Sequence, residues 1–203
     1  MCGRYSFDDT KDIYEARKII EDIASRLGSD AAKSVKTGEV FPSEAAAVVA
    51  QSALKNGYQA DVMHWGYPVR DSKQLIINAR SETIFEKGMF KRSIAHKKCL
   101  IPCTGFFEWK STGNIKEKYL IRPEGQEFFY LAGLYDCFDM QSLPQNRYVI
   151  LTAPANEAMI SIHSRMPLIV QKQFAQSWFK SALNPDIIKH IYDTTCSLAV
   201  KHV

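Results

Sequence analysis

The stretch KKCLIPCTGFFEWK at residues 97–110 predicts two consecutive strands, 97–103 and 106–110, with a turn at Gly105. Its side chains are mostly apolar or aromatic, and Gly and Pro interrupt the run. Further segments of the same kind follow it along the chain. We therefore expect the middle of the chain to be dominated by strands, which continue at 118–123, 127–138 and 147–153.

Other elements are expected on both sides of this block. AAAVVA at 45–50 and YQADVMHWGY at 58–67 predict a hairpin around Asn56-Gly57. Apolar residues at helical spacing predict a helix over 10–27, capped by Asp9 or Thr10 and ended by Gly28. A proline near the first turn favours a short helix at 154–162, and helical spacing predicts another at 171–183. A last helix is expected from Pro185 to about Tyr192, and MPLIV at 166–170 predicts a strand.

This order of elements predicts an α+β fold with helices flanking the strands. No regular βαβ alternation, repeat or linker is present, so we expect a curved, mostly antiparallel sheet or a barrel-like core. A chain of 203 residues can bury a sufficient core without disulfides or metal. We expect a single domain over residues 1–203.

Composition limits the function classes. The net charge of +4 permits a polyanionic partner without requiring one. The five cysteines are irregularly spaced and include no C-x-x-C pair, so we expect no metal, no cofactor and a reducing compartment; Cys99 and Cys103 are predicted to be buried in a strand. No secretory signal or membrane-length apolar run is present, and a cytoplasmic location is expected.

Cys2 is the first candidate for chemistry. If Met1 is removed, Cys2 carries an α-amine and a thiol on adjacent carbons. The amine can condense with an aldehyde, and the thiol can then close a five-membered thiazolidine ring in an intramolecular step. Gly3 allows close backbone approach, and Arg4 offers a phosphate-binding fork. Alternatively, Cys2 is a chance residue at a frayed terminus.

Three further polar groups interrupt apolar sequence. Asn78, within NARSET at 78–83, follows LII and could orient an amine or a sugar oxygen, unless this segment is a polar turn that caps a helix. Glu108, between Phe107 and Trp109, would suit proton transfer if buried, or would face water on a half-buried strand. His163 could shuttle protons or serve as a structural hydrogen bonder.

The segment KGMFKRSIAHKK at 87–98 has five Lys or Arg and no acidic residue. Such a loop, with Met89 and Phe90 inside it, can follow a phosphate backbone and contact bases. The alternative is a solvated basic loop.

Taken together and in this order, these segments resemble the SOS response-associated peptidase (SRAP) family, also called abasic-site processing proteins. The matching motifs extend from residue 1 to about residue 179. They are MCGRY at 1–5, HWGY at 64–67, INARSET at 77–83, CLIPCTGFFEW at 99–109, LAGLYD at 131–136 and ILTAPAN through IHSRMPLIV at 150–170.

The resemblance implies removal of Met1 and a thiazolidine crosslink between Cys2 and an abasic site in single-stranded DNA. It implies that Asn78, Glu108 and His163 complete the active site. It also implies an associated β-elimination (lyase) activity and self-processing. The DNA-contacting positions that it implies are Arg4, Arg80 and Arg165. Further residues expected to contact DNA are Pro42, Ser81, Glu82, Phe90, Arg92 and Thr152. We expect a monomer that binds neither metal nor membrane.

Two departures from the family pattern concern DNA contacts. VFPSE at 40–44 retains only Pro42 and a small polar residue of the usual turn, and Val69-Arg70 replace the usual second Trp after HWGY. Two other functions remain open. One is a thiol peptidase or amidohydrolase with Cys2 as nucleophile. The other is a non-catalytic single-stranded DNA-binding module.

Overall fold

The computed structural model describes residues 2–9, 13–52, 57–140, 143–195 and 197–203. Its centre is a sheet in which five strands close on themselves, because each pairs with the next and the last pairs with the first. The sequence prediction of an α+β fold with a barrel-like core is therefore confirmed. In ring order these strands are β12 (Leu143–Pro154), β4 (Tyr58–Trp65), β3 (Ala45–Gln51), β8 (Lys98–Cys103) and β11 (Phe129–Met140).

All ring pairings are antiparallel except the one between β12 and β4. At Gly133 of β11, a Cβ atom would lie 2.8 Å from the carbonyl oxygen of Val149 on β12, so only glycine fits this close approach. Three short strands extend the sheet from β12 and β11. They are β7 (Asn78–Arg80), β13 (Arg165–Pro167) and β14 (Ile169–Val170).

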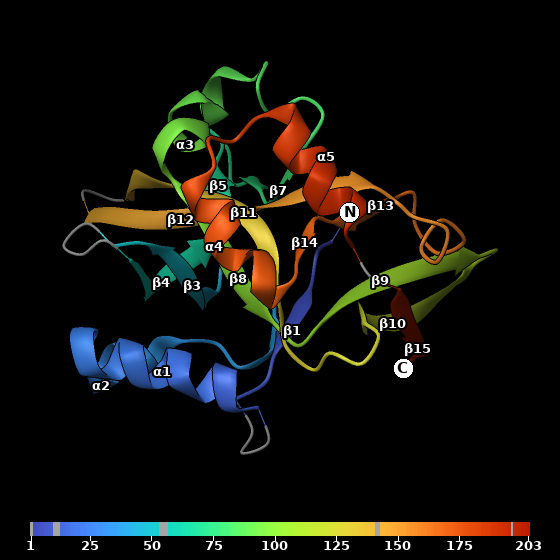
Figure 1. Ribbon diagram of the computed structural model, residues 1–203, viewed down its shortest axis with the longest axis horizontal. Helices are drawn as coiled ribbons and strands as arrows, with labels where there is room; N and C mark the ends of the chain where they lie inside the picture. Colours follow the sequence, from blue (N-terminus) through green and yellow to red (C-terminus); the bar gives the residue numbers. More distant parts are fainter. Residues whose placement is uncertain (1, 10–12, 53–56, 141–142, 196) are drawn as a thin grey trace.

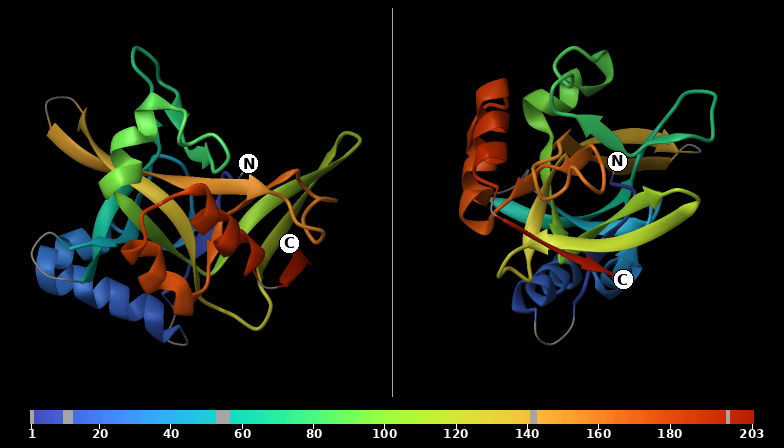
Figure 2. Two further views of the ribbon diagram at one scale, coloured as in Figure 1. Left: turned by 45° about the horizontal axis from the view of Figure 1, so that its top comes forward. Right: turned by 90° about the vertical axis from the view of Figure 1, so that its right-hand side faces the viewer.

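A second sheet of five strands lies beside the ring and carries the start of the chain. Its order is β15 (Leu198–His202), β10 (Ile115–Pro123), β9 (Gly105–Thr112), β1 (Tyr5–Phe7) and β2 (Gly38–Val40). The long β9–β10 hairpin extends away from the helices (Figures 1 and 2). β5 (Tyr67–Pro68) and β6 (Leu75–Ile76) form a separate pair.

Helices cover the ring on two sides. α1 (Tyr14–Leu27) and α2 (Ser29–Ser34) run below β3 and β4 in the view of Figure 1, and α4 (Ala175–Lys180) and α5 (Pro185–Asp193) lie in front of the sheet. The two-residue period of β12 divides the core between these sides. Tyr148 and Ile150 join the cluster that includes α1, whereas Val149 and Leu151 join the cluster that includes α4 and α5.

Most predicted elements are present, with different bounds. The expected hairpin forms from β3 and β4, although Asn56 lies outside the described residues. α1 ends at Gly28 as predicted, where φ is 92°. The predicted cap is wrong for Asp9, because the cap position is Ile13 and its side chain makes no capping bond; Thr10 lies outside the described residues.

The helix expected at 154–162 is wrong. β12 continues to Pro154, which pairs with Arg165 of β13, so the chain must reverse direction within this interval. Turn hydrogen bonds from Met159 and Ile160 to the Asn156 carbonyl achieve the reversal. The strand expected at 166–170 divides at Leu168, and the helix expected at 171–183 contains only η2 (Lys172–Phe174) and α4.

The basic segment 87–98 is not a loop. It forms η1 (Gly88–Phe90) and α3 (Lys91–His96) and then enters β8. α2 and β15 were not predicted. No helix among the described residues is long and apolar enough to span a membrane. Within the same residues, His, Cys, Asp and Glu side chains form no group of three that could hold a metal ion.

Candidate functional site

Strand β1 brings Cys2 to the middle of the second sheet. β1 pairs with β9, with Tyr5 opposite Phe106, and the ladder continues as the Phe107 amide donates to the Arg4 carbonyl at 2.9 Å. The residues before β1 therefore run alongside the part of β9 that contains Glu108. Cys2 has 0% of its surface exposed, and its thiol lies 3.6 Å from the Arg4 carbonyl oxygen. Cys2 is thus packed in the structure rather than frayed.

Asn78 connects the ring to Cys2. β7 pairs in parallel with β12, which places Asn78 opposite Ile150. The Asn78 Nδ2 atom donates to the Cys2 carbonyl oxygen at 2.9 Å. Asn78 Oδ1 is buried and has no hydrogen-bond partner within the described part of the chain, so it can accept a hydrogen bond from a bound molecule. Asn78 therefore both fixes Cys2 and offers an acceptor beside it.

Glu108 is only 3% exposed on β9, so the alternative that it faces water is wrong. Burial raises the pKa of Glu108, and the charge of His163 opposes this rise. Burial also raises the pKa of the Cys2 thiol, with a further rise from the charge of Glu108. The carboxyl group therefore lies within electrostatic reach of both the thiol and the imidazole.

His163 lies in the loop between β12 and β13. Its Nδ1 atom accepts a hydrogen bond from the Arg165 amide at 3.0 Å. Nδ1 also lies 3.2 Å from the Arg165 carbonyl oxygen, and the two contacts together orient the ring. The ring is half-buried, which suits a group that must reach a bound molecule.

Arg165 lies close after His163, and two residues, Glu82 and Thr152, hold its side chain. Its Nη2 atom donates to the Thr152 carbonyl at 2.7 Å and to Oε2 of Glu82 at 2.9 Å. The hydrogen bond from Arg165 lowers the pKa of Glu82 to about 2. Ser81 also donates to Glu82, at 3.1 Å. Thr152 is fully buried, so it can affect a ligand only through Arg165, contrary to the expectation of a direct contact with DNA.

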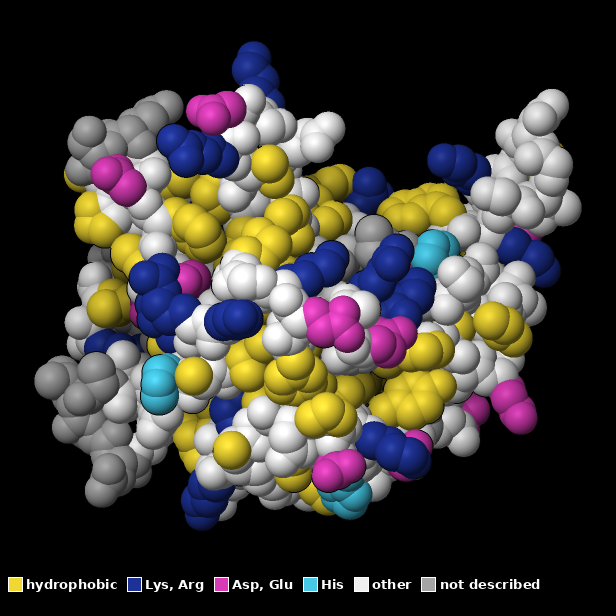
Figure 3. Space-filling model, turned by 90° about the horizontal axis from the view of Figure 1, so that it is seen from above, with side chains coloured by type: hydrophobic (Ala, Val, Ile, Leu, Met, Phe, Trp, Pro, Cys, Tyr) yellow, Lys and Arg dark blue, Asp and Glu magenta, His cyan; other side chains and the backbone are white. Residues whose placement is uncertain are grey.

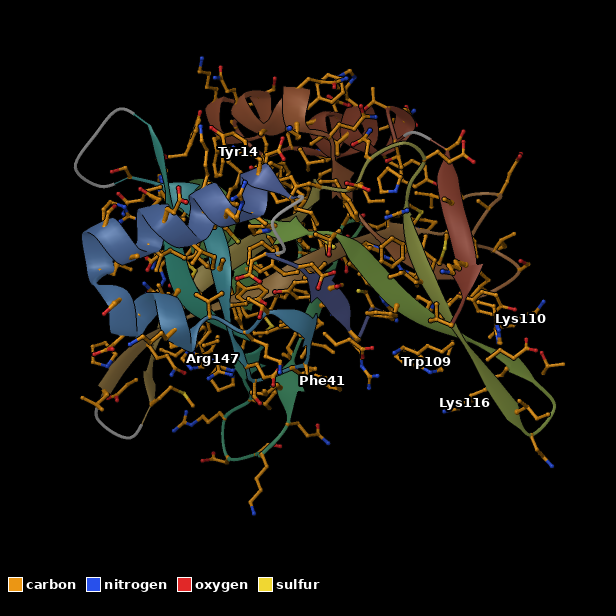
Figure 4. All side chains as sticks on the ribbon, turned by 90° about the horizontal axis from the view of Figure 1, so that it is seen from below. Tyr14, Phe41, Trp109, Lys110, Lys116 and Arg147 are labelled. Atoms are coloured by element: carbon orange, nitrogen blue, oxygen red, sulfur yellow. The ribbon has the colours of Figure 1, made fainter. Side chains whose placement is uncertain are left out.

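Arg4 lies between two aromatic rings. Its guanidinium carbon is 4.1 Å from the centre of the Phe41 ring and 4.9 Å from the centre of the Trp109 ring. Arg4 also pairs with Glu39 at 3.0 Å. Phe41 and Trp109 lie on the same side of the molecule in Figure 4, and Pro42 follows Phe41 in the chain as part of a turn. The sequence did not lead us to predict this stack, although FPSE at 41–44 and FEW at 107–109 contain the two rings.

The basic segment contributes less free charge than its sequence suggests. Arg92 and Lys97 both donate to the buried carboxylate of Asp136, at 2.7 and 2.5 Å. Lys98 donates to the carbonyls at the end of α4, including that of Trp178 at 2.6 Å, and burial lowers its pKa to about 8. A phosphate at Arg92 would have to compete with Asp136.

Phe90 is 2% exposed and packs against Tyr67, with 6.0 Å between ring centres. Its ring therefore cannot contact bases, and the expectation for this residue is wrong. Met89, which precedes it, is 42% exposed.

Arg80 is exposed at the end of β7, as a phosphate contact requires. Seen from above, Lys and Arg side chains lie beside a His side chain, with hydrophobic side chains on both sides (Figure 3).

The family model described as SOS response associated peptidase (SRAP) matches residues 1–202, and the chain therefore belongs to this family. Abasic site processing protein YedK of Escherichia coli is 29% identical over 198 residues, which cover 97% of this chain and 87% of that protein. YoaM of Bacillus subtilis, also called an abasic site processing protein, is 31% identical over 91% of this chain and 80% of its own length.

The fold also has a solved counterpart. A crystal structure of a protein from Bacteroides thetaiotaomicron superposes with a TM-score of 0.78 at 23% identity, covering 100% of this chain and 92% of that one. At this level of identity the similarity concerns the fold alone.

Proposed function

We propose that this protein responds to DNA damage by capturing abasic sites in single-stranded DNA through a covalent bond to Cys2. The observation that carries the proposal is the 2.9 Å hydrogen bond from Asn78 to the Cys2 carbonyl, which fixes Cys2 beside the buried Glu108. The relatives named abasic site processing proteins support the same substrate.

The chemistry begins after removal of Met1. The free amine of Cys2 attacks the aldehyde of the ring-opened sugar, and the carbonyl oxygen leaves as water to give an imine. The Cys2 sulfur then adds to the imine carbon, while the thiol proton is transferred to nitrogen. The product is a thiazolidine ring, and the net change is the loss of one water molecule. Ring closure is fast because the sulfur and the imine belong to one residue.

Glu108 and His163 donate and accept the protons in these reaction steps. Because burial raises the pKa of Glu108, its carboxyl group can donate a proton to the departing oxygen and accept one later. His163 can protonate the sugar oxygen as the ring opens when both ring nitrogens carry a proton, with Nδ1 then directed at the Arg165 carbonyl oxygen. Asn78 Oδ1 accepts from the amine or from a sugar hydroxyl. The same imine could also undergo β-elimination, which gives the lyase activity implied by the family resemblance.

A thiol peptidase is a weaker candidate. Such an enzyme needs a thiolate, whose pKa is usually lowered by a neighbouring cation. Here burial and Glu108 raise the pKa of Cys2, so the thiol stays protonated and the amine acts first. A non-catalytic DNA-binding module is also disfavoured, because Asp136 and α4 already engage much of the basic segment.

Single-stranded DNA fits a buried nucleophile, since a duplex would have to be unpaired and bent to bring its sugar to Cys2. We place Arg80 and Arg165 on the DNA backbone, with Pro42, Ser81 and Glu82 along the same path. Arg4 supports this surface from its position between Phe41 and Trp109. The protein is proposed to act as a monomer in the cytoplasm.

The test uses the complete protein and one oligonucleotide sequence in four forms. These are a single strand with one abasic site, the intact single strand, a strand whose abasic sugar has been reduced to remove the aldehyde, and a duplex with the abasic site. A denaturant-resistant adduct is expected with the first form, and far less with the duplex. An adduct of equal yield with the reduced strand, or no adduct with the first form, contradicts the proposal.

A further inference from the structure

A largely apolar groove of about 380 Å³ lies between α5 and the turn after β7. Its walls include the rings of Phe85 and Tyr192, both half-buried, and the buried side chains of Ala153 and Ile188. Pro154 and Pro185 add two further rings. A groove of this volume, with partly exposed aromatic faces, suits a flat organic group.

The groove is continuous with the candidate DNA site. Ser81 and Glu82 line it, and Glu82 is the carboxylate that pairs with Arg165. The Ser81 amide also donates to the Thr152 carbonyl at 2.9 Å, which ties this wall to β12. Only one residue separates Arg165 from His163. A strand whose abasic sugar lies at His163 therefore has neighbouring nucleotides within reach of the groove.

The charges at the rim exclude phosphate as the occupant. Glu82 and Asp186 both line the groove, and Lys189 at the same rim is already paired with Asp193 at 2.5 Å. Glu82 is already paired with Arg165, so Asp186 is the carboxylate that repels a phosphate, while the remaining lone pairs of either carboxylate can accept hydrogen bonds from the amino group of a base. The Ser81 hydroxyl can donate or accept. The groove thus combines apolar walls with a polar edge, as a nucleobase does.

We infer that this groove is a subsite for the base of a nucleotide flanking the abasic site, with a preference for bases that carry an amino group. The inference rests on the proposed function, because it assigns a neighbour of the captured sugar. The base inserts between Phe85 and Tyr192 and directs its amino group toward Glu82. Cytosine and adenine are favoured over thymine, which has no amino group.

The binding test uses strands with a reduced abasic sugar at the centre, so that no covalent step occurs. A second spacer without a base replaces each flanking nucleotide in turn, and affinity is measured by fluorescence anisotropy. Loss of a stacked base is worth about 1–3 kcal/mol, so one position is expected to lose about 5- to 150-fold in affinity. At that position, thymine binds more weakly than cytosine or adenine.

Substitutions in the groove test whether the loss of affinity at one flanking position arises there. Phe85→Leu and Tyr192→Leu keep an apolar side chain but remove a ring, and they are expected to flatten the spacer profile. Tyr58→Leu is the matched control, because Tyr58 stacks on Phe179 outside the groove, with 4.2 Å between ring centres. Thermal unfolding checks that each variant is folded. If a groove variant does not fold, the spacer profile of the wild-type protein still tests whether a flanking base is bound.

A flat spacer profile in the wild type overturns the inference, as does a profile that both groove variants leave unchanged. If the groove instead holds a second copy of the chain, the groove variants will alter the sedimentation coefficient but not the spacer profile. Failure of the proposed function is separate, since it appears as absence of the covalent adduct on the aldehyde-containing strand.

Discussion

Two polar regions of this protein differ in opposite ways from what their sequences suggest. The basic segment 87–98 has many charges, but Arg92 and Lys97 are bound to Asp136 and Lys98 is bound to the end of α4. The capture cluster, by which we mean Cys2, Asn78, Glu108 and His163, has few charges and lies in apolar surroundings. Buried polarity, rather than charge density, therefore distinguishes candidate chemistry from structural support.

The largest expected effect is at Cys2. Cys2→Ser keeps the amine but removes the sulfur that closes the ring, so any imine formed remains reversible. No denaturant-resistant adduct should be detected by gel electrophoresis with abasic single-stranded DNA. The control is Cys137→Ser, which changes an exposed cysteine outside the cluster and should preserve the yield. Equal loss in both variants would contradict the assignment.

Glu108→Gln is expected to slow adduct formation by about 10²- to 10⁴-fold, the usual contribution of a positioned acid or base. Single-turnover rates of adduct formation measure the effect. The control is Glu117→Gln, which changes a carboxylate on the neighbouring strand β10. A Glu108→Gln rate within a few-fold of the wild-type rate would remove Glu108 from the mechanism.

The pH dependence follows from the same carboxyl group. Because its pKa is raised in the folded state, Glu108 stays protonated above its ordinary range and loses its proton as pH rises through the raised value. The amine of Cys2 acts only when neutral, which is favoured above pH ~8. Rates measured from pH 5 to 9 should therefore be bell-shaped, and Glu108→Gln should lose the decline at high pH. A decline that persists in this variant would assign that limb to another group.

Glu108→Gln is expected to change the stability of the fold and the rate of capture in opposite directions. The raised pKa means that the ionised Glu108 destabilises the fold once pH exceeds it, whereas the protonated form does not. Glu108→Gln is therefore expected to increase the free energy of unfolding at pH 7 while it slows capture. A decrease measured by urea unfolding would indicate that Glu108 is retained for structure.

Asp136→Asn, which changes the partner of two cations in the basic segment, should have the opposite effects: the stability of the fold should fall and the rate of capture should stay nearly the same. It leaves Arg92 and Lys97 without their buried carboxylate, and we expect a loss of about 1–3 kcal/mol in the free energy of unfolding. The rate of adduct formation, measured well below the unfolding midpoint, should change little. A large loss of rate in a folded Asp136→Asn protein would place the basic segment in the capture step.

The smallest expected effects concern single phosphate contacts. Arg80 is exposed, whereas Arg92 is paired with Asp136. Arg80→Ala should weaken binding to strands of any sequence and reduce the slope of log affinity against log salt by about 0.7, the value for one phosphate contact on a single strand. Arg92→Ala should leave this slope nearly unchanged. Equal slopes in the two variants would contradict the conclusion that Arg80 contacts phosphate and Arg92 does not.

Local signals explain which parts of the fold the sequence predicts. Strands β3, β4 and β8–β12 follow from apolar and aromatic runs between turn residues. Ring closure depends on pairing of β12 with both β4 and β11, which no local signal specifies. A proline near the first turn favours a helix at 154–162, but the pairing of Pro154 with Arg165 overrides this preference. α2 has six residues and β15 five, too short for a clear period.

The candidate site shows the same limit. Polar residues within apolar runs identify Asn78 and Glu108, but their proximity to Cys2 depends on β7 and β9, which belong to different sheets. The pairing of charges is also non-local: Asp136 lies 44 residues from Arg92, and this pairing engages the Arg92 guanidinium. Burial of Phe90 against Tyr67 is likewise invisible in the basic run.

The most direct test of the central claim is the intact mass of the protein after incubation with abasic single-stranded DNA, with and without prior acetylation of its N-terminal amine. The unmodified protein is expected to lack Met1 and to gain the mass of the strand minus one water, whereas the acetylated protein should gain nothing. An adduct of equal yield on the acetylated protein would contradict ring formation at Cys2.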